Sequence, residues 1–270
     1  MAARTYIVLN RKGGVGKTST CFHLAGAYAQ QGRRVLLIDT DPQANLTEGV
    51  LGAEQASALP RGRTVTALFD DVPIPDPKAL TVPTPIANVV ILPGSETMEH
   101  INRDDPADDP RQVVLRDFVE EMRDQYDVVL IDCPPNILLG SWSALAAGDG
   151  VVVPLQVEEF GALGLKKLNH ALQRVRRAIN PRVALLGYLI TMINKKLSVH
   201  EIYEGTLREA FGAAVFTTVI PYLVDYKLAV MAHQPIGLYK PRSQAAKVIA
   251  ALADELLARD AANKERKEVA

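Results

Sequence analysis

The stretch that decides the fold is residues 12–20, KGGVGKTST, which directly follows the apolar residues 6–10. An apolar run, a glycine-rich turn and a helical pattern predict a strand, a loop and a helix that begins at Lys17. This geometry aims backbone N–H groups and the positive end of a helix at one point, which favours an anion. The glycines leave room for a polyphosphate. Lys17 can then contact the β- and γ-phosphates, and the Thr18 hydroxyl can ligate Mg²⁺.

Short β-rich runs alternate with helical patterns along the rest of the chain. This alternation predicts an α/β fold, a doubly wound and mostly parallel sheet with helices on both faces. The expected strands are residues 6–10, 35–38, 88–92, 127–131, 151–154, 183–193 and 217–220. The clearest expected helices are residues 17–31, 163–179 and 243–259.

The length and composition bound the organisation of the protein. With 270 residues and 23% charged residues, the chain fits a globular protein with one large domain, expected over residues 1–259. We expect the proline-rich residues 59–85 to form a surface excursion and the charged residues 260–270 to form a frayed tail. Neither a membrane-spanning run nor a secretory signal is expected, and the two cysteines have no metal-ligand spacing. A reducing cytoplasm fits these features.

Carboxylates follow two further apolar runs. Asp39 and Asp41 come directly after residues 35–38, and Asp132 comes after residues 128–131. Ligands of open α/β sheets bind at the carboxyl ends of the strands. Carboxylates at such strand ends can organise Mg²⁺ and an attacking water, and a lone aspartate after an apolar strand is the Walker B pattern. Together with the glycine-rich loop they predict a nucleotide site.

The three motifs together resemble those of the ParA/MinD family of P-loop ATPases, and the resemblance covers nearly the whole chain. Residues 12–18 resemble the family's deviant Walker A loop, KGGxGK[ST], and Arg11 stands where the common P-loop has glycine. Residues 39–43, DTDPQ, resemble its Walker A′ motif, and residues 132–135, DCPP, resemble its Walker B motif. The chain departs from the family's usual glycine and serine at Ala44 and Asn136.

The resemblance implies ATP or ADP and Mg²⁺ as cofactors and ATP hydrolysis as the activity. It gives catalytic roles to Lys12, which would act across an ATP-bound homodimer, to Lys17 on the phosphates and to Asp41 on the water. It gives metal-supporting roles to Thr18, Asp39 and Asp132. The implied nucleotide contacts are Lys12, Gly13, Gly14, Val15, Gly16, Lys17, Thr18, Ser19, Asn194 and Pro221. Gly13 would have to stay small because the second subunit packs against it.

The resemblance also implies a partition switch that binds DNA non-specifically and that a ParB-like adaptor stimulates. It would be a cytoplasmic, nucleoid-associated protein, bacterial or plasmid-encoded. Where partition proteins carry arginines, residues 222–229 read YLVDYKLA. Residues 161–200 contain eight basic and no acidic residues, which favours an anionic polymer or a solvated helix face. The candidate DNA-binding residues are Lys195, Lys196, Arg208, Lys227, Lys240, Arg242 and Lys247.

Other functions remain open at this point. A MinD-like ATPase would act on a membrane or a protein scaffold, but residues 260–270 lack the bulky apolar face of a membrane-surface helix, so no membrane partner is expected. A metabolic ATP-dependent enzyme could use the same fold, because fold does not fix function.

Overall fold

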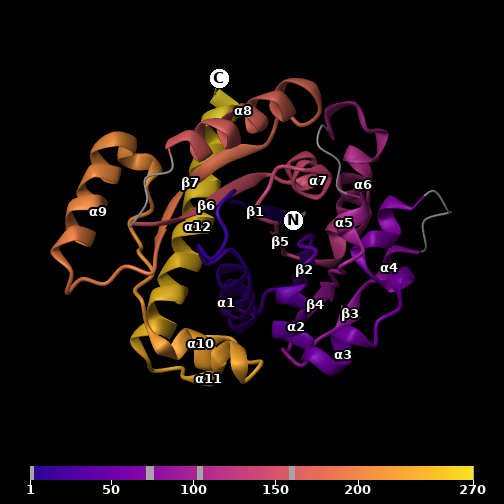
Figure 1. Cartoon of the computed structure of the whole chain (residues 1–270), viewed down its shortest axis with the longest axis horizontal. Coiled ribbons are helices and arrows are strands. Elements are labelled where there is room, and N and C mark those ends of the chain that lie inside the picture. Colours follow the sequence, from indigo (N-terminus) through magenta and orange to yellow (C-terminus); the bar gives the residue numbers. More distant parts are fainter. Residues whose placement is uncertain (1–2, 71–75, 102–105, 158–161, 270) are drawn as a thin grey trace.

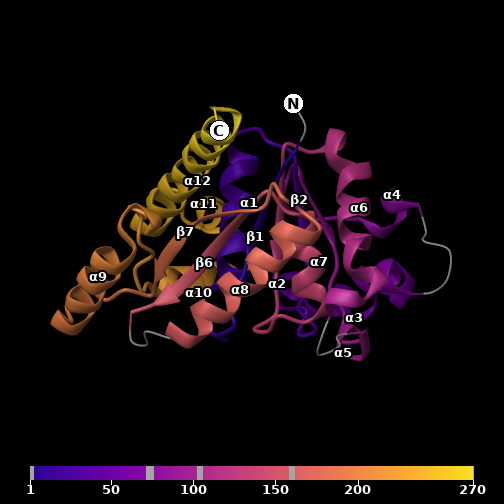
Figure 2. The ribbon, with the colours of Figure 1, turned by 90° about the horizontal axis from the view of Figure 1, so that it is seen from above.

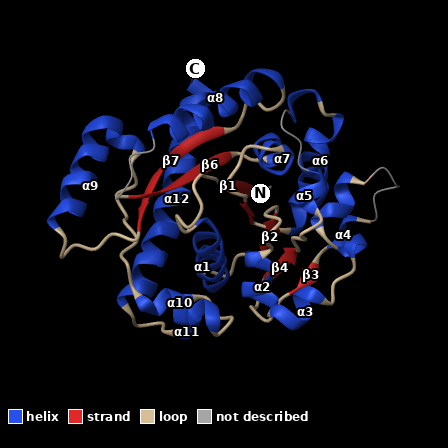
Figure 3. Cartoon of the chain, in the orientation of Figure 1, coloured by secondary structure: helices blue, strands red, loops and turns tan. Residues whose placement is uncertain are grey.

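One sheet organises the molecule. The computed structural model describes residues 3–70, 76–101, 106–157 and 162–269. Within them, seven strands form a sheet in the order β3-β4-β2-β5-β1-β6-β7 (Figures 1 and 3). Neighbouring strands are parallel except for β3 and β4, which are antiparallel. The strands are β1 Arg4–Val8, β2 Val35–Asp39, β3 Val82–Pro83, β4 Val89–Leu92, β5 Val128–Asp132, β6 Gly150–Gln156 and β7 Ala184–Thr191. The expected mostly parallel α/β sheet is confirmed.

Helices cover both faces of the sheet (Figure 2). Helices α1, α2, α10, α11 and α12 pack on one face, and α6, α7 and α8 pack on the other. Strand β1 shows why both faces are apolar: Ile7 enters the core under α6–α8, whereas Tyr6 and Val8 enter the core under α1 and α12. The bounds are α1 Lys17–Gln30, α2 Asn45–Leu51, α3 Ala53–Ser57, α4 Pro77–Leu80, α5 Met98–Ile101, α6 Val114–Met122, α7 Leu139–Ala147, α8 Ala162–Ala178, α9 Ser198–Phe211, α10 Val224–Met231, α11 Ile236–Tyr239 and α12 Gln244–Val269.

The strand expected over residues 217–220 is wrong. The two isolated bridges in this region lie just outside the segment, from Tyr188 to Val215 and from Ile193 to Pro221. The reason is that the Glu255 carboxylate of α12 accepts the backbone N–H groups of Thr217 and Thr218, both at 2.7 Å. Backbone N–H groups that donate to a side chain cannot also form strand hydrogen bonds with β7.

The closing helix is longer than expected. The helix predicted from the sequence ends at residue 259. Helix α12 instead continues to Val269 and includes most of the residues that were expected to form a charged tail. Asp260 is 5% exposed; it accepts hydrogen bonds from Arg4 Nε at 2.6 Å and from the Tyr6 hydroxyl at 3.1 Å. A charge pattern alone could not reveal this pairing, because its partners are more than 250 residues away.

The proline-rich segment is only partly a surface excursion. Val65–Phe69 forms a 3₁₀ turn whose side chains are buried in the core under α6, and Val82–Pro83 adds the antiparallel edge strand. Residues 71–75 of this segment lie outside the described residues. Among the helices that the structure describes, none is both long and apolar enough to cross a bilayer.

Candidate nucleotide site

The three sequence motifs meet at one edge of the sheet. Strand β5 lies between β1 and β2, so that Val8 and Asp39 are both paired in register with Asp132. All three strands are parallel, and their carboxyl ends therefore open on the same place. The glycine-rich loop follows β1, and Asp41 follows β2 by two residues. The structure thus brings the loop and the three aspartates together.

The loop has the backbone that its glycines allow. Gly14 and Gly16 adopt φ values of +73° and +87°, in the left-handed region that favours glycine, and Gly16 is the N-cap of α1. Lys17 lies at the start of the helix, is only 6% exposed and donates from Nζ to the Lys12 carbonyl at 2.9 Å. The loop therefore curls around its own lysine, in the manner of an anion cradle.

Neighbouring strands hold the loop from outside. Gln156 at the end of β6 donates to the Gly14 carbonyl at 3.1 Å, and Thr191 at the end of β7 donates to the Val15 carbonyl at 2.9 Å. Asn10 accepts the Lys12 N–H at 3.1 Å. Sequence reasoning missed these three residues. Their signal was their position as polar residues at strand ends, the same signal that singled out the aspartates.

Asp132 and Thr18 form the candidate metal edge of the site. The Thr18 hydroxyl donates to Asp132 Oδ2 at 2.6 Å, while Asp132 Oδ1 is buried with no hydrogen-bond partner among the described residues. Burial, followed by the nearby charge of Asp39, raises the pKa of Asp132 well above its usual value. A buried acceptor without a donor, next to a hydroxyl ligand, fits a site for a hydrated cation.

Asp39 holds the segment that carries Asp41. Its Oδ2 accepts from the Thr47 hydroxyl at 2.7 Å and from the Thr47 N–H at 3.0 Å, and its Oδ1 accepts the Asp41 N–H at 3.1 Å. The Thr47 hydroxyl in turn accepts the Gly94 N–H at 2.8 Å. Burial raises the pKa of Asp39 to about 6. Both oxygens of Asp39 therefore position the Walker A′ segment and the start of α2.

Lys17 is the cation that faces these carboxylates. Burial lowers the pKa of Lys17, and the charges of Asp132 and Asp41 act in the opposite direction. Asp41 is 7% exposed, and its Oδ1 accepts the Gln43 N–H at 3.0 Å. No cluster of three His, Cys, Asp or Glu side chains within the described residues could chelate a metal. A metal here would depend on Thr18, carboxylates that act through water, and phosphate oxygens.

Two cavities border the far side of the loop. The first, of about 470 Å³, is mainly apolar and runs from Gly16 and Ser19 to Met192 and Pro221. The second, of about 340 Å³, is lined by Asn194 and shares Met192 and Tyr222 with the first. Pro221, proposed from the sequence for the adenine, therefore lines the cavity next to the loop. Asn194 lies in the neighbouring one, where its Oδ1 accepts the Lys196 N–H at 3.1 Å.

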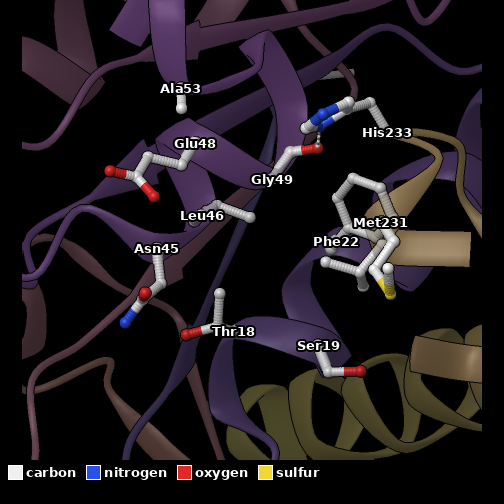
Figure 4. A pocket seen from close by; sticks show the side chains of 11 residues that line it. Thr18, Ser19, Phe22, Asn45, Leu46, Glu48, Gly49, Ala53, Met231 and His233 are labelled. Carbon is white, nitrogen blue, oxygen red and sulfur yellow. Dashed lines mark hydrogen bonds between the residues drawn. The ribbon is translucent and has the colours of Figure 1, made fainter. Parts of the chain in front are cut away.

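A third cavity, of about 430 Å³, opens between α1, α2 and α10 (Figure 4). Thr18 lies at one end, Phe22, Leu46 and Met231 form apolar walls, and His233 approaches the Gly49 carbonyl at 3.0 Å. The metal edge of the loop is thus continuous with an apolar hollow of the same chain.

The candidate DNA-binding residues fall into two groups. Three of them already have partners: Arg208 pairs with Glu204 at 2.7 Å, Lys240 pairs with Asp225 at 3.0 Å, and Lys227 donates to the Tyr222 hydroxyl at 3.3 Å. The other four are exposed and have no ion pair among the described residues; they are Lys195, Lys196, Arg242 and Lys247. The seven residues lie on or next to α9, α10, α11 and α12.

Comparison with known proteins gives a consistent result. Residues 3–185 match the family model described as an AAA domain. The chromosome partitioning protein ParA of Myxococcus xanthus is 34% identical over 99% of this chain and 92% of its own length. The chromosome-partitioning ATPase Soj of Thermus thermophilus is 38% identical over 95% of this chain and 96% of its own.

A solved structure of similar shape carries a different name. The cobyrinic acid a,c-diamide synthase of Mycobacterium smegmatis, determined with a bound ATP analogue and magnesium, is 27% identical, covers 94% of each chain and has a TM-score of 0.78. The near-full-length similarity to partition proteins agrees with the deviant loop at residues 12–18 and the aspartates at two strand ends. On this evidence the chain belongs to the ParA/Soj family of P-loop proteins with a deviant Walker A loop.

Proposed function

We propose that the protein is an ATP-dependent dimerising switch that binds DNA non-specifically, segregates or positions DNA, and hydrolyses ATP slowly until an adaptor of the ParB type stimulates it. Relatives named ParA and Soj support the partition role. The residues fit Mg²⁺ and ATP or ADP: the glycine loop is open for phosphates, and Asp132 Oδ1 is a buried acceptor beside Thr18.

Each site residue has a proposed role. Lys17 would bind the phosphates through its ammonium group, and Thr18 and Asp132 would hold Mg²⁺, which would offset the phosphate charge. Asp41 positions the attacking water and accepts its proton. Asp39 supports the metal site indirectly, because its two oxygens already accept hydrogen bonds from Thr47 and from the Asp41 backbone. Pro221 packs on the base, with Asn194 next to it.

The observation that carries the dimer is the space around Gly13. A Cβ on Gly13 would meet no atom within 4 Å, and its φ is not in the left-handed region. Neither the conformation nor the packing of this chain therefore requires glycine at position 13. A second subunit that packs against position 13 and leaves no room for a side chain would explain the glycine. Lys12, next to Gly13, would then reach the partner's phosphates and offset their developing charge.

Light scattering and nucleotide binding test this proposal. We expect wild type to be monomeric with ADP and dimeric with ATP, and Asp41→Ala to stay dimeric with ATP because the nucleotide persists. Gly13→Val should still bind ATP but remain monomeric. Gly62→Ala is the control, because Gly62 is exposed and has no atom within 4 Å of its Cβ position. Gly32→Ala would not serve, because the φ of Gly32 is +76°, which disfavours alanine. A Gly13→Val protein that dimerises like wild type would refute the interface role of Gly13, and a wild type that stays monomeric with ATP would refute the dimer.

Retention on DNA tests the rest of the proposal. The ATP-bound protein should be held at low salt and released at high salt, because phosphate contacts release counterions. A dimer that ignores DNA would redirect the function to another surface.

A metabolic enzyme is the second candidate, favoured by the 27% identical structure whose name is that of a synthase. An ATP-dependent small-molecule product, formed by a protein that stays monomeric with ATP, would support it over the switch.

A further inference from the structure

Helix α8 presents a row of cations on its outer surface. Its inner face packs into the core through Leu165, Leu168, Leu172 and Val175. At 100° per residue, Lys166, His170, Gln173 and Arg177 fall within about 40° of one direction on the opposite side. All four are exposed, and so are the flanking Lys167, Arg174 and Arg176. We call the cations Lys166, Lys167, Arg174, Arg176 and Arg177 the α8 ridge.

Within the described residues, four of the five ridge cations have no carboxylate partner. Lys166, Lys167, Arg176 and Arg177 take part in none of the ion pairs found within the described part of the chain. Residues 161–200 contain no Asp or Glu, and the adjacent helix α7, LGSWSALAA, has no charged residue. Arg174 lies over the Trp142 ring of α7 at 5.1 Å, which fixes one cation of the ridge in place.

The ridge differs from three of the seven residues that the sequence favoured for DNA; the other four, Lys195, Lys196, Arg242 and Lys247, are exposed and unpaired within the described residues, as the ridge cations Lys166, Lys167, Arg176 and Arg177 are. Arg208, Lys227 and Lys240 are held by Glu204, Tyr222 and Asp225. A cation that already has a partner must weaken that interaction to contact a phosphate, so it gains less from DNA. Lys166, Lys167, Arg176 and Arg177, which have no ion pair among the described residues, have no such interaction to weaken.

The chemistry of the ridge favours a phosphate backbone over a protein or a membrane. Every large apolar side chain that is exposed in the described residues lies elsewhere, on or near α9, α10 and α11. A protein partner needs apolar or aromatic anchors in a desolvated centre, and a membrane surface needs bulky apolar groups to insert. Cations with no large exposed apolar side chain beside them match the sequence-independent contacts of a nucleic-acid duplex.

We propose that the α8 ridge is a phosphate-binding surface for double-stranded DNA. This inference rests on the proposed DNA-binding function and assigns it to a surface on the sheet face opposite α12. Lys166 and Arg177 are 11 residues apart, or about 17 Å along the helix axis, so they reach separate phosphates of one duplex.

Charge reversal on the ridge is the test. The variant Lys166→Glu/Arg177→Glu should lose affinity for a duplex of random sequence, measured with ATP and Mg²⁺ between 50 and 200 mM salt. Each lost phosphate contact lowers the slope of log K against log salt by about 0.9, so two contacts lower it by about 1.8. At 0.1 M salt this corresponds to roughly 60-fold weaker binding.

A matched control separates the ridge from net charge. Arg63→Glu/Lys78→Glu makes the same change in charge at two exposed positions outside α8, and its slope should equal that of wild type. The neutral pair Lys166→Gln/Arg177→Gln should lose the same slope as the Glu pair, but less affinity. All variants should bind ATP as wild type does, which confirms that they fold.

The outcomes distinguish the two proposals. If wild type binds DNA and the ridge variant keeps its slope, or if the control loses as much, the ridge is not the surface and the proposed function survives. If the ridge variant keeps its DNA slope but loses stimulation by an adaptor, the ridge binds an acidic protein and this inference is wrong. If wild type with ATP binds no DNA at 50 mM salt, both the proposed function and this inference fail.

Discussion

Replacing Gly94 by alanine should destabilise the protein through Asp39. A Cβ at Gly94 would lie 2.7 Å from Asp39 Cγ and 2.9 and 3.1 Å from its two oxygens. The carboxylate cannot retreat freely, because Asp39 is fully buried and Thr47 and the Asp41 N–H hold both oxygens. Overpacking of this kind costs about 1–3 kcal/mol, and weakening one hydrogen bond to a charged group adds about 1.5 kcal/mol.

We therefore expect the free energy of unfolding of Gly94→Ala to fall by about 2–4 kcal/mol, as measured by urea denaturation, and Tm to fall by at least about 4 °C. Gly205→Ala is the matched control. Gly205 lies inside α9, is exposed and has nothing within 4 Å of its Cβ position, so alanine should raise stability by about 0.5–1 kcal/mol. A Gly94→Ala protein as stable as wild type would show that the Asp39 segment yields, and the reasoning would fail.

Three further predictions concern pH, the chain end and the loop. Burial lowers the pKa of His23 to about 3, so the unfolded state, in which the pKa is about 6.5, takes up the proton first as the pH falls. The free energy of unfolding should therefore decrease from pH 6.5 towards pH 3 by up to about 1.4 kcal/mol per pH unit. A His23→Gln variant, compared with wild type by urea unfolding at pH 7 and pH 5, should lack this component. Asp260→Ala removes the acceptor of Arg4 and Tyr6 and should lower the free energy of unfolding by about 2 kcal/mol in the same assay. An unchanged free energy of unfolding would mean that the contacts of α12 beyond residue 259 do not stabilise the fold. Lys17→Ala should weaken ATP binding at least about 30-fold in calorimetry, since a buried cation that pairs with phosphate is worth about 2–5 kcal/mol; equal affinity would remove Lys17 from the phosphate site.

The parts of the fold that local patterns determine were predictable. Strands β2 and β5 are continuous apolar runs because helices cover both of their faces, and the glycines at 14 and 16 occupy positions that require left-handed backbone. The same local logic found the strand-end aspartates, and the parallel sheet then brought them to one edge.

What failed depended on contacts between distant residues. Residues 217–220 look like a strand, but Glu255 takes the N–H groups of Thr217 and Thr218. Residues 260–270 look like a polar tail, but Asp260 is an acceptor for the first strand. No window of neighbouring residues contains either pair of partners, and the same limit hid the roles of Gln156 and Thr191 in holding the loop.

The position of β1 in the sheet has a consequence for synthesis of the protein. Arg4 pairs in register with Val128, and Tyr6 pairs with Gly150, so the first strand made is flanked only by strands made much later. More than half of the chain has to leave the ribosome before the glycine-rich loop has a finished scaffold, and nucleotide cannot stabilise the nascent chain before then. Contacts at such long sequence separation slow folding. Until they form, the apolar strand β1 stays exposed, and exposed apolar segments of this kind are bound by chaperones.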